Sequence, residues 1–394
     1  MARRTAVARR LAVARRLAVR GRAGADPGAT ASGVRRGRPV RPVGTVALLV
    51  TLLAVLVVSI GAAVTVGPAD IPVSTVWAVV ADRLGLAHAD VPLLREHIVW
   101  RLRLPRVLGA AVLGAGLAAV GAVTQTVTRN PLADPYLLGV SSGASLGAVA
   151  VLVLGVGGGV AALTGGAFTG ALAAFAVVAA VAGRRAALAP TRVVLAGVAV
   201  AQLCGAATSF VIVWVADPHA TQSITFWLSG SLARVDWPAL AWVVPVLAAV
   251  LALVAAHART LNAFAFGEDA AETLGVPVTR VRWLLLVATA LLTAALVAVS
   301  GAVGFVGLIL PHAARFLTGA DHRRLLPVVV LAGAIFMVWV DTAARTLFAP
   351  RELPVGVLTA LLGVPAFVVL LHRARPAESR RPRGRWAGCR KAGD

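Results

Sequence analysis

Residues 101–149 read RLRLPRVLGAAVLGAGLAAVGAVTQTVTRNPLADPYLLGVSSGASLGAV. Three arginines surround Pro105, and a run of apolar and small residues follows that is about as long as one bilayer crossing of about 20 residues. The polar pair Thr124 and Gln125 interrupts this run near its end, before the polar stretch 128–135, and a second run of small residues begins at Tyr136. This order predicts a membrane helix, a proline-rich elbow and another membrane helix. The many glycines and alanines of the first helix favour close packing in lipid.

The composition is that of a membrane protein. Hydrophobic residues make up 59% of the chain, and charged residues make up 14%, against about 25% in soluble domains. The net charge is +22, but residues 1–43 carry +11 and residues 373–394 carry +6. This distribution argues against a nucleic-acid partner and fits basic flanks of membrane spans. We therefore expect a disordered, basic cytoplasmic tail at 1–43, a transmembrane domain at 44–372 and a second basic cytoplasmic tail at 373–394.

The apolar runs predict an all-α fold with about ten transmembrane helices. The expected spans are 44–66, 104–127, 136–155, 160–182, 193–215, 239–257, 283–303, 305–318, 325–347 and 354–371. With both termini in the cytoplasm, every short inner loop carries arginine, as the positive-inside rule requires. The run 283–318 is too long for one span, and both of its flanks are basic. It is therefore either two short spans with a break at 301–304 or a re-entrant pair.

The order of several motifs resembles one family. The motifs are RLPR at 103–106, the elbow motif from Gln125 to Ala144, GAVGFVGLILPH at 301–312, DHR at 321–323 and ELPVG at 352–356. Residues 44–372 resemble the FecCD-type permeases, which are membrane subunits of binding-protein-dependent ABC importers for ferric siderophores, haem and cobalamin. The resemblance implies a type II ABC importer permease fold in the plasma (inner) membrane.

The resemblance also implies partners. These are a second permease subunit that is either a copy or a paralogue, two ATP-binding subunits and an extracellular or periplasmic substrate-binding protein. The conduit is expected at the dimer interface, lined by the 104–127 helix and its neighbours. The chain itself is not expected to be an enzyme, because its single lysine, Lys391, lacks the context of a phosphate-binding loop. We expect no cofactor and no metal site, since His312 has no ligand partner near it in sequence and the two cysteines do not cluster.

Three arginines are candidates for docking the binding protein. Arg103, Arg106 and Arg345 map to the outer ends of their spans, where interface snorkelling is the simpler alternative. The resemblance implies that they present exposed cations to carboxylates of the binding protein. Asp341 lies one turn before Arg345 and is expected to pair with it. The other interpretation of Asp341 is a proton-coupling acid.

Two further sets of residues lie toward the cytoplasmic face. The resemblance places Asn130, Leu132 and Thr191 in a cytoplasmic gate, although Pro190-Thr191 departs from the two hydroxyl residues that are frequent in relatives. In the longest inner loop, the residues Gly267 to Gly275 predict a short surface helix. The resemblance makes this helix the docking point for the ATPase. Its residues are Gly267, Glu268, Ala271, Leu274 and Gly275, with Ala271 and Leu274 expected on the side available to the partner.

The predicted function is import of an iron–siderophore complex, with cobalamin or haem as alternatives. An ion-coupled secondary transporter is a rival, but it would require acids near mid-membrane, and the acids of the core lie in loops or at span ends. A basic membrane-anchored scaffold has only the tails in its favour.

Overall fold

The computed structural model describes residues 42–88, 90–155, 159–183, 190–215, 218–264 and 266–373. Residues 1–41 and 374–394 lie outside these residues, so the expected disorder of the N-terminal tail and the cytoplasmic location of both tails stay predictions. Within the described ranges every regular element is a helix, which confirms the all-α fold class.

Among the described residues, seven helices are long and apolar enough to cross a membrane. They are α2 (Pro42–Thr65), α5 (Leu104–Val127), α7 (Val160–Ala182), α8 (Pro190–Trp214), α10 (Trp237–Ala256), α13 (Val278–Ser300) and α15 (His322–Thr346). Three shorter apolar helices are α6 (Val140–Leu154), α14 (Val306–Thr318) and α16 (Val355–Arg373). A helix thus lies at each predicted span, whereas the number of full crossings and the sidedness remain predictions.

Short helices occupy the connections between these elements. They are α3 (Val73–Arg83), α4 (Leu93–His97), the π-helical turn η1 (Ile98–Arg103), the 3₁₀ turn η2 (Pro135–Leu138), α9 (Pro218–Leu228), α11 (Ala258–Phe264) and α12 (Glu268–Thr273). Helix α12 agrees with the surface helix that the sequence predicts between Gly267 and Gly275. In contrast, α4 and η1 extend α5 backwards, so that Leu93–Val127 forms one helical run.

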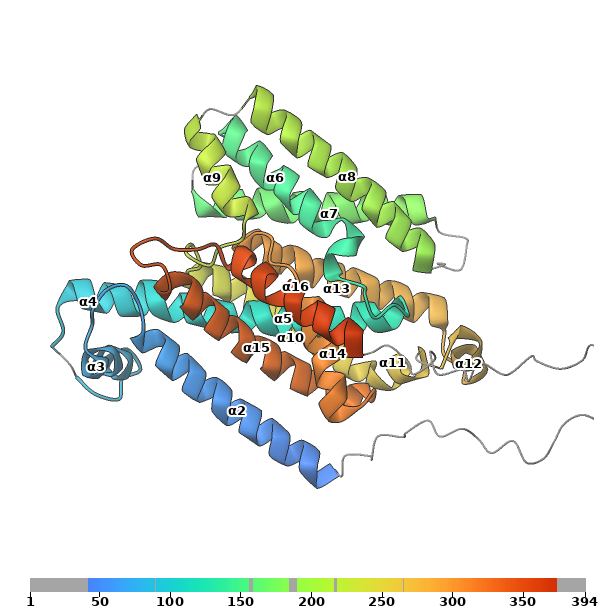
Figure 1. Cartoon of the computed structure of the whole chain (residues 1–394), viewed down its shortest axis with the longest axis horizontal. Coiled ribbons are helices and arrows are strands. Elements are labelled where there is room, and N and C mark those ends of the chain that lie inside the picture. The colour runs from blue at the N-terminus through green and yellow to red at the C-terminus, as the bar shows by residue number, and fades with distance from the viewer. Residues whose placement is uncertain are drawn as a thin grey trace, which may run out of the picture. The chain divides into compact units, whose positions relative to one another are not determined.

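Helix α5 lies at the centre of the arrangement (Figure 1). It packs against α2, α10, α13, α14 and α15. Nearly all of its residues from Pro105 onwards are buried. The expectation that this helix lines a conduit at a dimer interface is therefore wrong, because its surroundings within its own chain leave it no free face. A conduit between two subunits has to use helices that keep an exposed face.

Glycine allows α5 to approach its neighbours backbone to backbone. A Cβ on Gly114 would lie 2.0 Å from the carbonyl oxygen of Gly333 in α15. A Cβ on Gly121 would lie 2.0 Å from the carbonyl oxygen of Gly307 in α14. Such contacts are the small-residue packing that replaces the hydrophobic effect between helices in lipid. They hold α5, α14 and α15 together as a tightly packed group.

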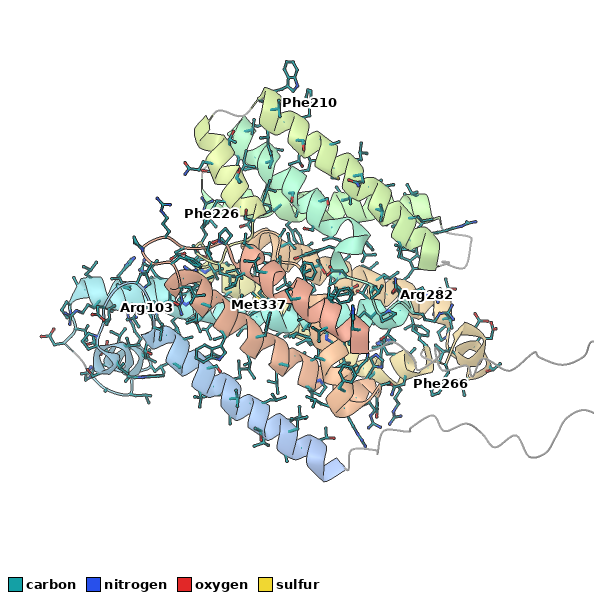
Figure 2. All side chains as sticks on the ribbon, in the orientation of Figure 1. Arg103, Phe210, Phe226, Phe266, Arg282 and Met337 are labelled. Carbon is teal, nitrogen blue, oxygen red and sulfur yellow. The ribbon has the colours of Figure 1, made fainter. Side chains whose placement is uncertain are left out.

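The periphery contrasts with this centre. In the most apolar stretch of each helix, only 17% of the residues of α2 and 22% of those of α8 are buried. Figure 2 shows Met337 of α15 among the central helices and Phe210 on α8 at their edge, and the two side chains are 0% and 60% exposed. The outer helices therefore present apolar side chains to lipid or to another subunit.

Candidate functional site

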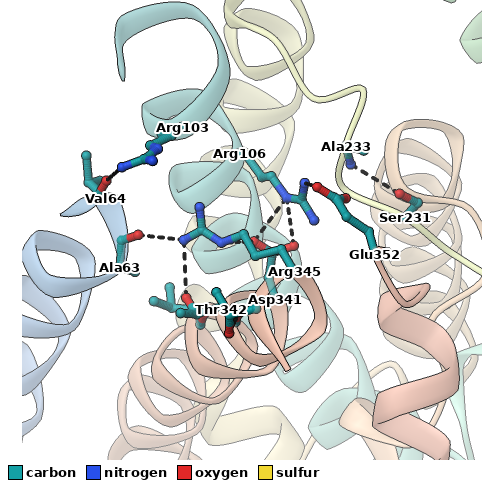
Figure 3. Close-up of polar contacts among 12 residues, drawn as sticks. Ala63, Val64, Arg103, Arg106, Ser231, Ala233, Asp341, Thr342, Arg345 and Glu352 are labelled. Carbon is teal, nitrogen blue, oxygen red and sulfur yellow. Dashed lines mark hydrogen bonds and ion pairs between the residues drawn. The ribbon is translucent and has the colours of Figure 1, made fainter. Parts of the chain in front are cut away.

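A buried group of charges lies where α5 begins (Figure 3). We call Arg103, Arg106, Asp341, Arg345 and Glu352 the arginine cluster. The Nε of Arg106 donates to Asp341 Oδ1 at 3.0 Å, and its Nη1 donates to Glu352 Oε2 at 2.9 Å. Arg106 thereby joins α5 to α15 and to the loop before α16. A guanidinium that holds two carboxylates in this way makes strong, charge-assisted hydrogen bonds.

Asp341 also faces Arg345 on its own helix. The Nε of Arg345 lies 3.7 Å from Asp341 Oδ2, which confirms the pairing expected from their spacing. Its Nη2 donates to the backbone oxygen of Ala63 at the end of α2. The side chain of Asp341 is 0% exposed and has two arginine partners. This environment supports a structural ion pair and argues against a proton-coupling role for Asp341.

Arg103 makes a different contact. Its guanidinium donates to the backbone oxygens of Val64, Thr65 and Ala69, where α2 ends and the chain turns. Gly67 lies so close that a Cβ there would sit 2.9 Å from Arg103 Cζ. Arg103 thus satisfies carbonyl groups that the end of α2 leaves without helical partners.

The three arginines do converge, but they are not exposed. Arg103, Arg106 and Arg345 are 5%, 9% and 2% exposed. The expectation of exposed cations is therefore wrong, because each guanidinium is engaged by groups of its own chain. All three line a pocket of about 330 Å³ together with Glu352. The arginine cluster contains three arginines and two carboxylates, of which Glu352 lines the pocket, so the cluster keeps a net positive charge.

The elbow after α5 contains the predicted gate residues Asn130 and Leu132. The Oδ1 of Asn130 accepts from the N–H of Leu132 at 2.9 Å, which fixes the turn. The Leu132 side chain is 48% exposed. Thr191 lies in the first turn of α8, and its side chain is outside the described part of the structure. Helix α8 packs against η2, just after the elbow, so the two predicted halves of the gate belong to neighbouring elements.

Tyr136, which sequence reasoning missed, supports the break between α13 and α14. Its hydroxyl donates to the oxygen of Val303 at 2.7 Å and accepts from the N–H of Val303 at 2.9 Å. The break begins at Gly301, where φ is +68°. Irregular backbone at membrane depth needs such partners. The signal available in the sequence was that Tyr136 is the single tyrosine of the chain.

Helix α12 has the ends that the sequence predicts. Gly267 precedes it with φ +105°, and Gly275 follows it with φ +79°. The N–H of Gly275 donates to Glu272 O and that of Val276 to Ala271 O, which is the Schellman pattern of a helix end. The two glycines therefore delimit a compact surface helix of six residues.

The exposed face of α12 differs from the expected one. Ala271 is 0% exposed, so the expectation that it is available to a partner is wrong. Ala271 instead packs against the rest of the protein, where α12 contacts α11 and α13. Leu274 is 72% exposed as expected, and Phe266 just before the helix is 80% exposed (Figure 2). The side chain of Glu268 lies outside the described residues.

A chain of buried polar groups connects α11, which precedes α12, with α5. We call Asn262, His322 and Thr126 the polar chain. Asn262 Oδ1 lies 2.8 Å from His322 Nδ1 and also accepts from the N–H of His322. His322 Nε2 lies 2.7 Å from Thr126 Oγ1. Because Asn262 Nδ2 donates to Asp321, its oxygen faces His322, and the neutral imidazole then donates from Nδ1, while Nε2 faces the Thr126 hydroxyl, which also lies 2.8 Å from the oxygen of Ala122.

Asp321 fixes the orientation of Asn262 from outside the span. Its carboxylate accepts from Asn262 Nδ2 at 2.7 Å and from the N–H of Arg323, which caps α15. Partial burial acts to raise the pKa of Asp321, but these hydrogen bonds and the nearby arginine charges outweigh it and hold the pKa below its ordinary value. The group is therefore ionised at neutral pH and keeps the Asn262 amide in one orientation.

Gln125 ties the same end of α5 to α14. Its Nε2 donates to the oxygens of Gly307 and Leu308, and Arg315 Nη1 donates to its Oε1 at 2.5 Å. Gln125 and the polar chain thus bind α5 to both α14 and α15 at one level. From Arg106 to Thr126 the helix rises about 30 Å, which is the thickness of the hydrocarbon core. The arginine cluster and the polar chain therefore lie at opposite ends of α5, about one hydrocarbon thickness apart.

Comparison with known proteins agrees with this arrangement. Residues 52–373 match the FecCD transport family. The cobalamin import system permease protein BtuC of Halobacterium salinarum is 42% identical over 80% of this chain and 86% of its own length. The hemin transport system permease protein HmuU of Yersinia pestis is 42% identical over 72% of this chain and 85% of its own length.

One uncharacterised relative and one solved structure extend the comparison. The ABC transporter permease protein YvrB of Bacillus subtilis is 40% identical over 81% of this chain and 91% of its own length. A metal-chelate type ABC transporter solved in an inward-facing conformation matches with a TM-score of 0.73 and 30% identity, over 83% of this chain and 99% of that chain. These findings confirm the resemblance seen in the sequence. The chain belongs to the FecCD transport family and is a multi-pass plasma-membrane permease of the ABC-importer type.

Proposed function

We propose that this chain is the translocation subunit of an importer for a metal chelate, working with a second permease subunit, two ATP-binding subunits and a substrate-binding protein. The observation that carries the proposal is the pair of sites at the two ends of α5. At one end the arginine cluster lines a pocket, and at the other a surface helix with exposed Leu274 is joined through the polar chain to α5. The pocket of the arginine cluster offers a contact for the substrate-binding protein, and the surface helix offers one for the ATP-binding subunit.

Three chelates are candidates for the substrate. The sequence motifs alone favoured an iron–siderophore complex, whereas the relatives above are named for cobalamin and hemin. The proposal is therefore import of a large organic metal chelate, with cobalamin and haem preferred over a siderophore. Uptake of labelled cobalamin, hemin and a ferric siderophore by the assembled importer in vesicles distinguishes the three. Uptake of none of them would contradict the substrate class.

The ATPase contact is proposed at α12, with Leu274 as its exposed apolar residue. Leu274→Asp should weaken the association of the ATPase with the permease by about tenfold or more, because the charge would be buried at the contact. Burying a leucine side chain contributes about 1.5–3 kcal/mol, and aspartate forfeits this contribution. The measurement is the ratio of ATPase to permease after affinity purification. Because the ATPase is a cytoplasmic partner, the same result supports the proposed sidedness.

Leu86→Asp is the matched control for this prediction. Leu86 is 77% exposed in the loop after α3, toward the end of the molecule that carries the arginine cluster. The control should co-purify with the ATPase as the native chain does, and both variants should elute from size exclusion like the native protein. An unchanged ATPase ratio for Leu274→Asp would contradict docking at α12 and the sidedness together.

Docking of the binding protein is proposed at the pocket of the arginine cluster. Reversing an arginine charge is an unsuitable test, because Arg106→Glu would place a third carboxylate beside Asp341 and Glu352. Glu352→Gln is better, since Glu352 is 32% exposed on its side chain and Arg106 keeps Asp341. The variant raises the positive charge at the pocket, so the binding protein should bind about 1.4- to 5-fold more tightly, as exposed pairs contribute about 0.2–1 kcal/mol.

The affinity of the binding protein for the immobilised permease is measured at two salt concentrations. The gain from Glu352→Gln should shrink at high salt, because exposed charges are screened beyond about 8 Å at physiological ionic strength. Asp269→Asn is the control, since it removes an exposed carboxylate on α12, at the other end of the molecule. If Glu352→Gln leaves affinity and its salt dependence unchanged, the arginine cluster has a structural role alone.

The gate is proposed at the elbow around Asn130 and Leu132, with Thr191 opposite. Support comes from the packing of η2, which directly follows the elbow, against α8. The polar chain lies at the same end of α5, one turn before the elbow. Motion of α12 that follows ATP binding would therefore reach the elbow through α11, α15 and the end of α5.

A further inference from the structure

A groove on the outside of the helix bundle combines a long apolar wall with one charged end. It has a volume of about 610 Å³ and lies between α2, α10 and α15. This volume is in the range of about 300–1,000 Å³ found for small-ligand sites. Ten of its eleven lining residues are apolar, and the remaining one is Arg323. The groove is remote from the arginine cluster and is not part of the polar chain.

All three helices place the groove near one membrane surface. Arg323 is the second residue of α15, and the lining part of α10 reaches Ala255, next to the last residue of that helix. The lining residues of α2 lie in its first half, between Leu49 and Leu53. The groove is therefore open to the hydrocarbon along its length and has its charged end at the helix ends, where headgroups lie.

The length of the groove matches one leaflet. Its lining residues on α15 run from Arg323 to Leu331, which is about 12 Å of helix. Half of the hydrocarbon core is about 15 Å. An acyl chain that enters beside Arg323 would therefore lie along the groove for most of the depth of one leaflet. Val50 and Leu53 remain 63% and 53% exposed, so a lipid tail would cover apolar surface there.

The charged end adds chemical selectivity. Arg323 is exposed, and a guanidinium binds phosphate through two parallel hydrogen bonds. Pro327, which also lines the groove, has no N–H, so the backbone oxygen of Arg323 receives no helical hydrogen bond from that position. A cationic donor and a backbone acceptor thus lie together. This pair suits a headgroup that carries a phosphate and a hydroxyl, as phosphatidylglycerol does.

We propose that the groove between α2, α10 and α15 binds one anionic phospholipid, with its phosphate at Arg323 and an acyl chain along the apolar wall. Charge complementarity favours this occupant over a neutral lipid. The apolar wall at membrane depth favours it over a soluble protein. The proposal rests on the membrane location of the chain and is independent of its substrate and of the ATPase contact.

The test is lipid retention by the purified full chain. The protein is extracted in mild detergent and mixed with equal amounts of phosphatidylglycerol and phosphatidylcholine, and the bound lipids are counted by native mass spectrometry. The native chain should retain phosphatidylglycerol preferentially. Arg323→Gln should bind it about fivefold more weakly, because one arginine near a headgroup contributes about 1 kcal/mol. Arg351→Gln removes another exposed arginine, far along the chain, and should change nothing.

A second variant tests the apolar wall. Leu53→Trp adds bulk at an exposed position of the groove, so it should fold and should reduce retention of both lipids. Equal retention of the two lipids by the native chain would overturn the proposal. So would retention by Arg323→Gln that equals that of Arg351→Gln. A second copy of the chain in the groove would appear instead as a dimer that Leu53→Trp dissociates, which also overturns it.

Discussion

Replacing Asp341 with alanine should destabilise the folded permease by about 3–5 kcal/mol, the cost of leaving buried charges without their partner. The carboxylate is 0% exposed and lies between Arg106 and Arg345. Without it, Arg345 would retain hydrogen bonds to Ala63 O and Thr342 Oγ1 but no carboxylate. The measurement is the fraction of protein that stays monodisperse after heating in detergent, compared across a series of temperatures.

Two variants make this result specific. Asp70→Ala removes an exposed carboxylate in the loop after α2 and should melt as the native chain does. Asp341→Asn keeps an oxygen that Arg106 can bond but loses the charge, so it should fall between the alanine variant and the native chain. If Asp341→Ala melts together with Asp70→Ala, the arginine cluster does not hold α5 and α15 together, and its burial has another cause.

The sequence could predict the helices because each apolar run has clear ends. The predicted span 104–127 coincides with α5, and the polar elbow ends the run as expected, although the helical run itself begins earlier, at Leu93. The break near 301–304 was predicted from length and loop charge alone, and the chain does leave its helix at Gly301. Apolar runs of about 20 residues therefore predict helices reliably, because the thickness of the membrane sets the length of a span.

The sequence did not predict α4, the turn η1 or α9. Helix α4 and the turn η1 contain Arg95, Glu96 and Arg103, which lower the local hydropathy below that of a span. The helix forms because Pro92 precedes it and α5 continues it. Helix α9 was likewise assigned to a loop. In both cases packing on an existing helix, and not the local pattern, determines the structure.

The same limit explains the error about the arginines. Sequence position correctly placed Arg103, Arg106 and Arg345 near one surface, but their partners come from far along the chain. Arg106 binds residues 235 and 246 positions away, and Arg103 binds backbone oxygens of α2. No local pattern shows whether a cation at a span end meets water or a buried carboxylate.

The polar chain carries the second large prediction, which concerns coupling. Asn262→Leu keeps the approximate volume but removes the acceptor for two His322 N–H groups and the donor to Asp321. A buried polar group left without a partner costs about 1–3 kcal/mol. If this free energy couples the two ends of α5, its loss changes the equilibrium between the coupled states about 5- to 150-fold. Substrate uptake per ATP hydrolysed should fall in that range, while ATP hydrolysis by the assembled importer changes less than twofold.

A double-mutant cycle separates coupling from simple loss of stability. Thr126→Val removes the other hydrogen bond of His322 and does not touch Asn262, so independent roles would give additive effects on uptake per ATP. A shared path predicts that the double variant is little worse than either single one. Thr169→Val, which loses bonds only within its own helix, should leave the ratio unchanged. Additive losses, or a fall in ATP hydrolysis equal to the fall in uptake, would show that His322 only packs α15 against α5. A non-additive result would make His322 the point at which motion of the α11–α12 segment enters the helix core.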